Sequence, residues 1–334
     1  MDLSEFLTEW HNDRPTVLVH TSGSTGKPKP LLVEKRRMEA SARITCQFLG
    51  LKEGDTALLC MPLDYIAGKM MVVRALTCGM RLVSVEPKGC PEWDGPVDFA
   101  AMVPLQVWNL LQQAPERLLQ IRHLIIGGGA VNDELAAALK DLPNAVWSTY
   151  GMTETLSHIA LRRLNGPERS DWYTPFEGVD VSLNEEDCLV INAPAVHDGP
   201  LVTNDIAELS PLPSFPSFAR LPVAFHPLPQ KFRILGRKDN VICSGGIKIQ
   251  IEEVERLLHP HLHVPYMITK APDQRLGEQV VLLTEAHDIS TIQDICRQVL
   301  PKYWQPRKYL SVGHLPMTET GKPARAEAER LATR

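Results

Sequence analysis

The sequence predicts an α/β fold: a large α/β domain with a mainly parallel sheet, followed by a small α+β domain. From Thr16 to about Pro229, short apolar runs alternate with helical patterns, as in repeated strand–helix–strand units. Near Asp239 the pattern changes to short strands and helices typical of a second unit. The chain has 334 residues, enough for two units, and we place their ranges at 1–236 and 237–334.

Strands of the large domain are expected where short runs are mostly apolar, as in buried strands. These runs are Thr16–Val19, Thr56–Cys60, Arg81–Val85, Phe99–Val103, Leu124–Ile126 and Ala145–Thr149. Between them, residues 34–49 place apolar side chains on one helical face and stop at Gly50, a residue that commonly ends helices. Asn132 is a good cap for an alanine-rich helix that runs to Lys140.

In the small domain, Ile247, Ile249 and Ile251 alternate as in a strand and lead into a helical run over residues 252–257. Further predicted elements are a strand at Gln279–Thr284, a helix at Ile292–Leu300 and a strand at Lys308–Val312. Residues 211–229 contain six prolines and little charge, which predicts an irregular connection without chemistry of its own.

Composition favours a small-molecule enzyme of the reducing cytosol. The chain has 35 basic and 40 acidic residues, and a net charge of -5 gives no reason to expect nucleic acid as a partner. Its seven cysteines form no C-x-x-C pair, so neither a disulfide framework nor a zinc site is indicated. His259, His261 and His263 alternate, but the neighbouring prolines interrupt any strand there and favour a surface connection over a metal site.

No membrane insertion is expected. The first residues lack the basic and then apolar layout of a secretory signal. The most apolar region, Tyr65–Met80, is broken by Lys69 and Arg74, and is too short and too charged to span a bilayer.

A loop rich in hydroxyls and glycine follows the first strand and is suited to wrapping phosphate oxygens. Its residues are Thr21, Ser22, Gly23, Ser24, Thr25, Gly26 and Lys27. Glycines let successive N–H groups point inward, hydroxyls add donors, and the lysine adds a charge. It is not a Walker A loop, because Thr21 stands where that pattern needs glycine and Pro28 follows the lysine. Taken alone, the stretch could also be a flexible polar turn.

Four further motifs follow in order, and together with the loop they resemble the adenylate-forming enzymes, which include acyl-CoA synthetases and peptide-synthetase adenylation domains. The motifs are Tyr150–Thr155, Thr203–Leu209, Gly236–Gly246 and Thr320–Pro323. The resemblance implies a large nucleotide- and acyl-binding domain and a small mobile C-terminal domain. It also implies ATP, Mg²⁺ and coenzyme A as co-substrates or cofactors.

The resemblance assigns most of the nucleotide site to loops that end predicted strands. Gly128 and Gly129 would lie along the adenine, although a tight turn explains these glycines equally well. Tyr150 would stack on the purine, beside Gly151 and Met152. Asp205 would hold the ribose hydroxyls, with a polar turn as its structural alternative.

The resemblance also assigns the reacting groups. Thr153 would contact a phosphate and Glu154 would bind Mg²⁺, although the pair could simply start a helix. Lys322 would be the catalytic lysine of acyl-adenylate formation, or else an ordinary solvated lysine.

The hinge between the two domains follows from the same resemblance. Arg237 would contact the nucleotide, and Asp239 would absorb the rotation of the small domain. Ser244, Gly245 and Gly246 would then face coenzyme A.

The substrate expectation rests on chain length and two stretches, Pro62–Lys69 and Thr153–Ala160, which look most like the o-succinylbenzoate CoA ligases of menaquinone synthesis. Relatives usually carry well over a hundred residues before the phosphate loop, so a shortened first subdomain is expected here. Lys69 and His158 are the expected acyl-pocket residues, with Arg162 a further candidate, and each could instead be structural. Asp64 and Tyr65 stand where many relatives have an aromatic residue and a histidine.

Three alternatives remain open at this point. A different aryl or short-chain acid would keep every nucleotide motif. A carrier-protein adenylation module would perform only the first half-reaction on its own. A non-catalytic nucleotide-binding protein is disfavoured by the intact Glu154, Asp205, Arg237 and Lys322. The sequence leaves the oligomeric state open.

Overall fold

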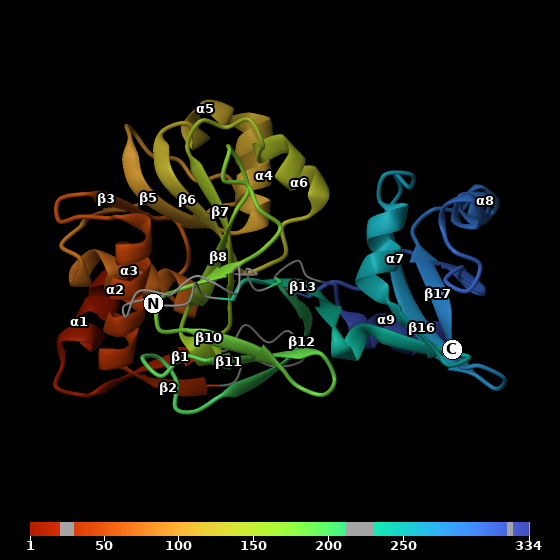
Figure 1. Ribbon diagram of the computed structural model, residues 1–334. Coiled ribbons are helices and arrows are strands. Elements are labelled where there is room, and N and C mark those ends of the chain that lie inside the picture. The colour runs from red at the N-terminus through yellow and green to blue at the C-terminus, as the bar shows by residue number, and fades with distance from the viewer. Residues whose placement is uncertain (21–29, 212–229, 319–322, 334) are drawn as a thin grey trace, which may run out of the picture.

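The structure is a computed structural model that describes residues 1–20, 30–211, 230–318 and 323–333. Figure 1 shows a large unit that runs from α1 to β13 and a smaller unit that carries the C-terminus. The predicted α/β class is confirmed, because a largely parallel sheet with helices on both faces forms the core of the large unit.

The central sheet has seven strands in the order β4-β3-β5-β6-β7-β8-β9. Its strands are β3 (Thr56–Leu59), β4 (Arg81–Ser84), β5 (Val97–Met102), β6 (Ile121–Ile126), β7 (Ala145–Gly151), β8 (His158–Arg163) and β9 (Thr174–Pro175). The strands from β4 to β7 pair in parallel, whereas β8 and β9 join antiparallel. The parallel strands therefore bring their carboxyl ends to one edge, where ligands bind in sheets of this kind.

Helices cover both faces of this sheet because side chains alternate along each strand. Ala57 and Leu59 of β3 join one buried cluster, and Leu58 joins another on the opposite face. The first face carries α2 (Lys35–Leu49) and α3 (Ile66–Thr77); the second carries α4 (Pro104–Gln113), α5 (Pro115–Leu118) and α6 (Asp133–Leu139). As predicted, α2 ends at Gly50, which has a φ of 65°, and the Asn132 side chain caps α6.

The first predicted strand has a different partner from the one the sequence suggested. The strand β1 (Thr16–His20) pairs antiparallel with β2 (Pro30–Glu34) in a separate two-stranded sheet, not in the parallel sheet. Beside it, α1 (Leu3–His11) buries Phe6 completely in the core shared with α2 and α3. An apolar run predicts a strand, but it does not identify the strand's neighbour.

A four-stranded antiparallel sheet that the sequence did not predict completes the large unit. It consists, in spatial order, of β10 (Asp180–Leu183), β11 (Cys188–Asn192), β12 (Leu201–Leu209) and β13 (Phe232–Arg237). Most of the proline-rich stretch, residues 212–229, lies outside the described residues.

The small unit begins after a single 3₁₀ turn, η2 (Lys238–Asn240). Its sheet has the order β15-β14-β17-β16, with β18 parallel to β17. Its elements are β14 (Val241–Ser244), β15 (Ile247–Gln250), α7 (Ile251–Leu258), β16 (Tyr266–Asp273), β17 (Gly277–Thr284), α8 (Ile289–Val299), β18 (Lys308–Ser311) and α9 (Arg325–Thr333). Ile251, predicted as the end of a strand, instead begins α7, and β16 and α9 were not predicted.

All seven cysteines are free thiols. Within the described ranges, no three or more His, Cys, Asp or Glu side chains gather as a metal cluster would require. None of the helices in the described part of the chain combines the length and apolar character that crossing a bilayer requires.

Candidate active site at the strand ends

Two residues predicted for the nucleotide site donate hydrogen bonds to a third, Asp205 of β12, and the three lie on three different strands. The Tyr150 hydroxyl at the end of β7 donates to Asp205 Oδ2 at 2.6 Å. Arg237 Nη1, at the end of β13, donates to Asp205 Oδ1 at 3.3 Å. Each carboxylate oxygen keeps a second acceptor position, so the group can still receive hydroxyl donors. Burial, followed by the charge of Asp205, raises the pKa of Tyr150 and keeps its proton in place as a donor.

The ring of Tyr150 is held by two other aromatic residues. Its centroid lies 5.1 Å from that of Phe232, edge to face, and 5.8 Å from that of Tyr173. Tyr173 and Phe232 stack on each other at 5.5 Å. The aromatic group therefore fixes the Tyr150 side chain, and its contact with a purine stays a prediction.

The segment after Tyr150 forms a tight turn around Thr155. This side chain accepts a hydrogen bond from Met152 N–H at 3.0 Å and lies 2.7 Å from the Ser157 carbonyl oxygen, to which it donates. Gly151 is required by packing, because a Cβ there would lie 2.2 Å from that same carbonyl oxygen. The turn buries Thr153 and leaves Glu154 exposed.

The exposed Glu154 carboxylate fits the donor set that Mg²⁺ uses when it also binds phosphates. Magnesium retains several waters and takes one or two carboxylates together with substrate oxygens. A single protein carboxylate after the end of a strand agrees with that pattern, and the role of Glu154 toward Mg²⁺ stays a prediction.

The glycine turn after β6 contains one position whose glycine the surrounding protein does not explain. A Cβ on Gly127 would lie 2.5 Å from Thr149 Oγ1, and Gly128 has a φ of 75°, so both favour glycine for structural reasons. At Gly129 a Cβ would only touch Pro104 Cγ, at 3.6 Å, an ordinary contact.

At the junction of the two units, the Asp239 carboxylate accepts two hydrogen bonds. Arg237 Nη2 donates to its Oδ2 at 3.1 Å, and Asn204 Nδ2 donates to the same oxygen at 3.3 Å. The packing of the junction also favours glycine at position 236, because a Cβ on Gly236 would lie 2.3 Å from Gln250 Nε2. Asn204, the residue before Asp205, thus contacts the predicted hinge directly.

The predicted coenzyme A loop is the turn of a β-hairpin. Ser244 pairs with Ile247, and Gly245 and Gly246 between them have φ values of 59° and 84°. Two left-handed residues match a tight hairpin turn that favours glycine. The glycines therefore have a structural reason, and their role toward coenzyme A stays a prediction.

Two predicted parts lie outside the described residues. They are the phosphate loop, residues 21–29, and the catalytic lysine, Lys322. The strand β1 ends at His20, directly before the loop.

Lys69 has partners other than an acyl group. Its side chain is only 3% exposed, and its ammonium donates to the Leu18 carbonyl oxygen at 2.6 Å. Glu9 Oε2 lies 3.6 Å away, and the Phe6 ring centroid lies 5.5 Å away. This geometry favours the structural alternative for Lys69, because its charge is already paired within the protein, and its role toward the acid stays a prediction.

His158 is buried in a chain of hydrogen bonds that defines its tautomer. Thr45 Oγ1 donates to the Ser41 carbonyl oxygen at 3.1 Å, so it accepts from His158 Nε2–H, also at 3.1 Å. The other ring nitrogen, Nδ1, then accepts from the Ser157 hydroxyl at 3.1 Å. Burial, reinforced by the Arg74 charge, holds the pKa of His158 well below 6.5, so the ring is neutral.

At the end of this chain lies Arg74, which the sequence analysis did not select as a site residue. It is 2% exposed, and its Nη2 donates to Ser157 Oγ at 2.5 Å. The ionisable groups that act on it are the thiols of Cys46 and Cys78, and no described carboxylate pairs with it. Its Nε has no hydrogen-bond partner among the described residues.

An unpaired buried guanidinium is unusual, since buried charges are normally matched by an opposite charge. Burial lowers the pKa of Arg74 to about 10, so it stays cationic at neutral pH. The sequence did carry a signal, an arginine within the apolar helix α3, but that pattern only excluded a membrane span.

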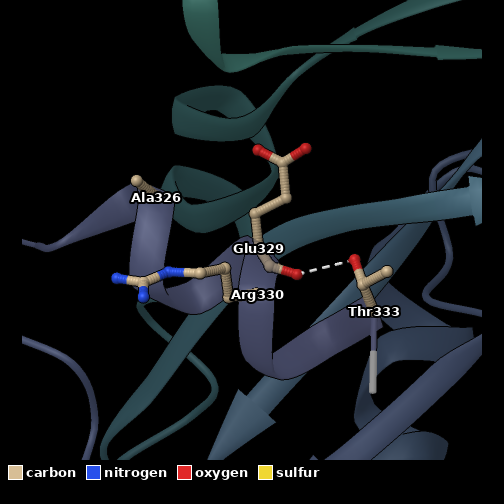
Figure 2. A pocket seen from close by; sticks show the side chains of 4 residues that line it. All are labelled: Ala326, Glu329, Arg330 and Thr333. Carbon is tan, nitrogen blue, oxygen red and sulfur yellow. Dashed lines mark hydrogen bonds between the residues drawn. The ribbon is translucent and has the colours of Figure 1, made fainter.

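A small hollow borders His158. Its lining is mostly apolar and includes Ser41, Ile44, Ile159, Phe176 and Val196. A second, open hollow lies on α9 and contains none of the predicted site residues. Figure 2 shows its lining side chains, Ala326, Glu329, Arg330 and Thr333, and the 2.8 Å bond from the Thr333 hydroxyl to the Glu329 carbonyl oxygen.

Comparison with known proteins identifies the family. The model of the family described as AMP-binding enzyme matches residues 4–194. The 2-succinylbenzoate–CoA ligase of Salmonella typhimurium is 26% identical, with 92% of this chain and 67% of that protein covered. The corresponding enzyme of Geobacillus kaustophilus is also 26% identical, at 94% and 69% coverage. The chain spans about two thirds of the length of these curated relatives.

Solved structures agree. A Dyadobacter fermentans protein described as acyl-CoA synthetase (AMP-forming)/AMP-acid ligase II-like is 31% identical, with a TM-score of 0.62, and 97% of this chain and 92% of that one are covered. The o-succinylbenzoate coenzyme A synthetase of Bacillus subtilis, in complex with ATP and magnesium ion, shares the fold with a TM-score of 0.73 at 22% identity, over 93% of this chain and 69% of that one. The chain therefore belongs to the AMP-binding enzyme family.

Proposed function

We propose that this chain is an ATP-dependent acid–CoA ligase whose substrate is o-succinylbenzoate. In the first half-reaction a substrate carboxylate oxygen bonds to the α-phosphorus of ATP, and the bond to pyrophosphate breaks. In the second, the sulfur of coenzyme A bonds to the acyl carbon, and AMP leaves. The names of the curated relatives support this assignment.

The observation that carries the choice of acid is the unpaired buried charge of Arg74. o-Succinylbenzoate has two carboxylates and only one is activated, so the other needs a cation or hydrogen-bond donors in a mostly apolar site. The Nε–H of Arg74 has no partner among the described residues, and Ser157 links Arg74 to His158. We therefore place the second carboxylate at Arg74, with His158 beside it, and no longer at Lys69.

The remaining residues would align two anions that repel each other. Asp205 would receive the ribose hydroxyls, and Arg237 would orient that carboxylate, as it does here. The absence of a structural reason for Gly129 supports close approach of a flat ring at that turn. A magnesium ion at Glu154 would neutralise phosphate charge, while Lys322 and the loop at residues 21–29 would supply donors. The small domain, residues 237–334, would then turn about Asp239 for the thiol step.

The test is an assay against a panel of carboxylic acids, with pyrophosphate release and thioester formation measured separately. We expect both products with o-succinylbenzoate, and much less of either with benzoate-like acids that lack the succinyl carboxylate. Activity confined to monocarboxylates would overturn the substrate. Pyrophosphate without thioester would indicate a carrier-protein adenylation module, and neither product with any acid would overturn the ligase assignment.

A further inference from the structure

The strand β1, which leads to the predicted phosphate loop, pairs with β2 along one edge and is held along its other edge by an ion pair. Leu18 of β1 donates its backbone N–H to Glu9 Oε1 at 3.2 Å. Its carbonyl oxygen accepts from Lys69 Nζ at 2.6 Å. In the described residues β1 pairs only with β2, so the two side chains occupy the free edge of β1 and supply the bonds a further strand would make.

The pair is well suited to a fixed geometry. Lys69 is 3% exposed and Glu9 is 24% exposed, and their charged atoms lie 3.6 Å apart. Glu9 Oε2 has no hydrogen-bond partner among the described residues, so its charge depends on Lys69 for compensation. Removal of one partner would leave an uncompensated charge in the interior, which is strongly unfavourable.

The pair also connects two parts of the proposed site. Lys69 and Arg74 both lie on α3, the helix that carries the proposed acid-binding charge. Leu18 lies on β1, which ends at His20, the residue before the predicted phosphate loop. If the acid binds at Arg74 and the phosphates bind after β1, the distance from the acid to the α-phosphorus depends on how β1 is placed against α3.

We propose that Lys69 and Glu9 are positioning residues that lock β1 to α3, and so align the phosphates of ATP with the acid. The proposal rests on the proposed ligase function for its catalytic consequence, whereas the lock itself is a property of the fold. Lys69 acts through the backbone of Leu18 and touches no substrate.

The experiment compares Lys69→Met, Glu9→Gln and the double variant with wild type. Hydrogen exchange at the Leu18 amide reports the lock without reference to catalysis. Pyrophosphate-release kinetics report KM for ATP and for the acid. The control is Lys88→Met, which breaks an ion pair of 2.8 Å with Glu86 between exposed side chains.

We expect the Leu18 amide to exchange faster than in wild type in all three variants, and at the wild-type rate in the control. KM for ATP should rise about tenfold in Lys69→Met, with KM for the acid nearly unchanged. The double variant should be no worse than Lys69→Met, because the two residues act as one unit.

Unchanged Leu18 exchange in both single variants would overturn the lock. A rise in KM for the acid alone would return Lys69 to the acyl pocket and also overturn it. An equal loss of kcat/KM for ATP and for the acid, together with lower stability in Glu9→Gln, would show that the pair only stabilises the fold. That result would overturn its positioning role. If wild type forms no acyl-adenylate, the ligase assignment fails, and the exchange measurement still decides the lock.

Discussion

Arg74 is the residue whose two candidate roles predict opposite changes in stability. If its charge exists to bind substrate, replacement by methionine removes an unpaired buried cation and should leave the free energy of unfolding unchanged or higher. In the same variant, KM for o-succinylbenzoate should rise by roughly 30-fold or more, since loss of a buried charged partner costs about 2 kcal/mol or more. Urea denaturation and steady-state kinetics measure the two effects.

Arg122→Met is the matched control for Arg74. Arg122 is 43% exposed and pairs with Asp55 and Asp98, so its loss should slightly lower stability and leave KM for the acid unchanged. A large loss of stability in Arg74→Met, without a change in KM, would show that Arg74 is structural and would remove our basis for a dicarboxylate substrate.

His158 should make stability depend on pH. Because burial holds its pKa well below 6.5 in the folded state, the unfolded chain takes up a proton near pH 6.5 that the folded chain refuses. The contribution of the neutral His158 ring to the free energy of unfolding is complete above pH 6.5. It is lost as the pH falls, by up to about 1.4 kcal/mol per pH unit. Urea denaturation between about pH 7 and pH 5 should therefore show a shallower slope for His158→Gln than for wild type.

The comparison of variants is needed because burial also lowers the pKa of His123, which contributes a slope of the same sign. Equal slopes in wild type and His158→Gln would mean that His158 takes up a proton in the folded protein over the same pH range as in the unfolded chain. The conclusion that burial lowers the pKa of His158 would then be wrong.

Lys69 and Arg74 show how far residue-level prediction could go. In the sequence they are two cations in one apolar stretch, and nothing local distinguishes them. The structure separates them through Glu9, a residue distant in the sequence that pairs with Lys69 and not with Arg74. By contrast, Tyr150, Asp205 and Arg237 could be grouped in advance because each lies in a recognisable motif, and the structure brings them together.

At the scale of elements, α3 is held in place by a close contact at its first turn. A Cβ on Gly68 would lie 2.2 Å from the Pro62 carbonyl oxygen, which is backbone and has little freedom to move. Gly68→Ala should therefore shift α3 and lower the free energy of unfolding by about 1–3 kcal/mol, despite the better helix propensity of alanine. Urea denaturation measures the change.

The control is Gly313→Ala, because a Cβ there meets nothing within 4 Å. Since α3 carries both Lys69 and Arg74, the Gly68 variant should also raise KM for ATP and for the acid together. Full stability with normal kinetics would mean that the Pro62 segment yields easily, and that α3 is not positioned by this contact.

The sequence pattern predicted which segments form strands, but it did not predict which strands pair with each other. The six short apolar runs of the large domain all became strands, because aliphatic and β-branched residues suit buried positions in a sheet. The pattern could not show that β1 would leave the parallel sheet and pair with β2. Nor could it predict the sheet from β10 to β13, whose last strand follows the proline-rich stretch.

At the scale of the whole molecule, contacts between the two units gather at the turn that joins them. Asn204 of β12 reaches Asp239, and Lys238 pairs with Glu186 at 2.6 Å. Farther from the turn, His259 of the small unit lies 3.5 Å from Glu134 on α6. These pairs involve largely exposed side chains, so each contributes little to stability and is compatible with rotation of the small unit.

The hinge proposal predicts that the two half-reactions can be separated by a change at Asp239. Proline fixes φ near −65° and would obstruct rotation of the backbone without removing groups that act in adenylation. Asp239→Pro should keep pyrophosphate release and slow thioester formation by roughly tenfold or more, as rapid-quench measurement of both products would show. Asp239→Ala separates this backbone effect from loss of the carboxylate contacted by Arg237 and Asn204, and should be much milder.

Lys322→Ala should give the reverse pattern, with adenylation reduced by about 10²–10³ and thioester formation from supplied acyl-adenylate preserved. Thioester formation at the wild-type rate in Asp239→Pro would place the pivot elsewhere, and an equal loss of both half-reactions in Lys322→Ala would contradict the rotation itself.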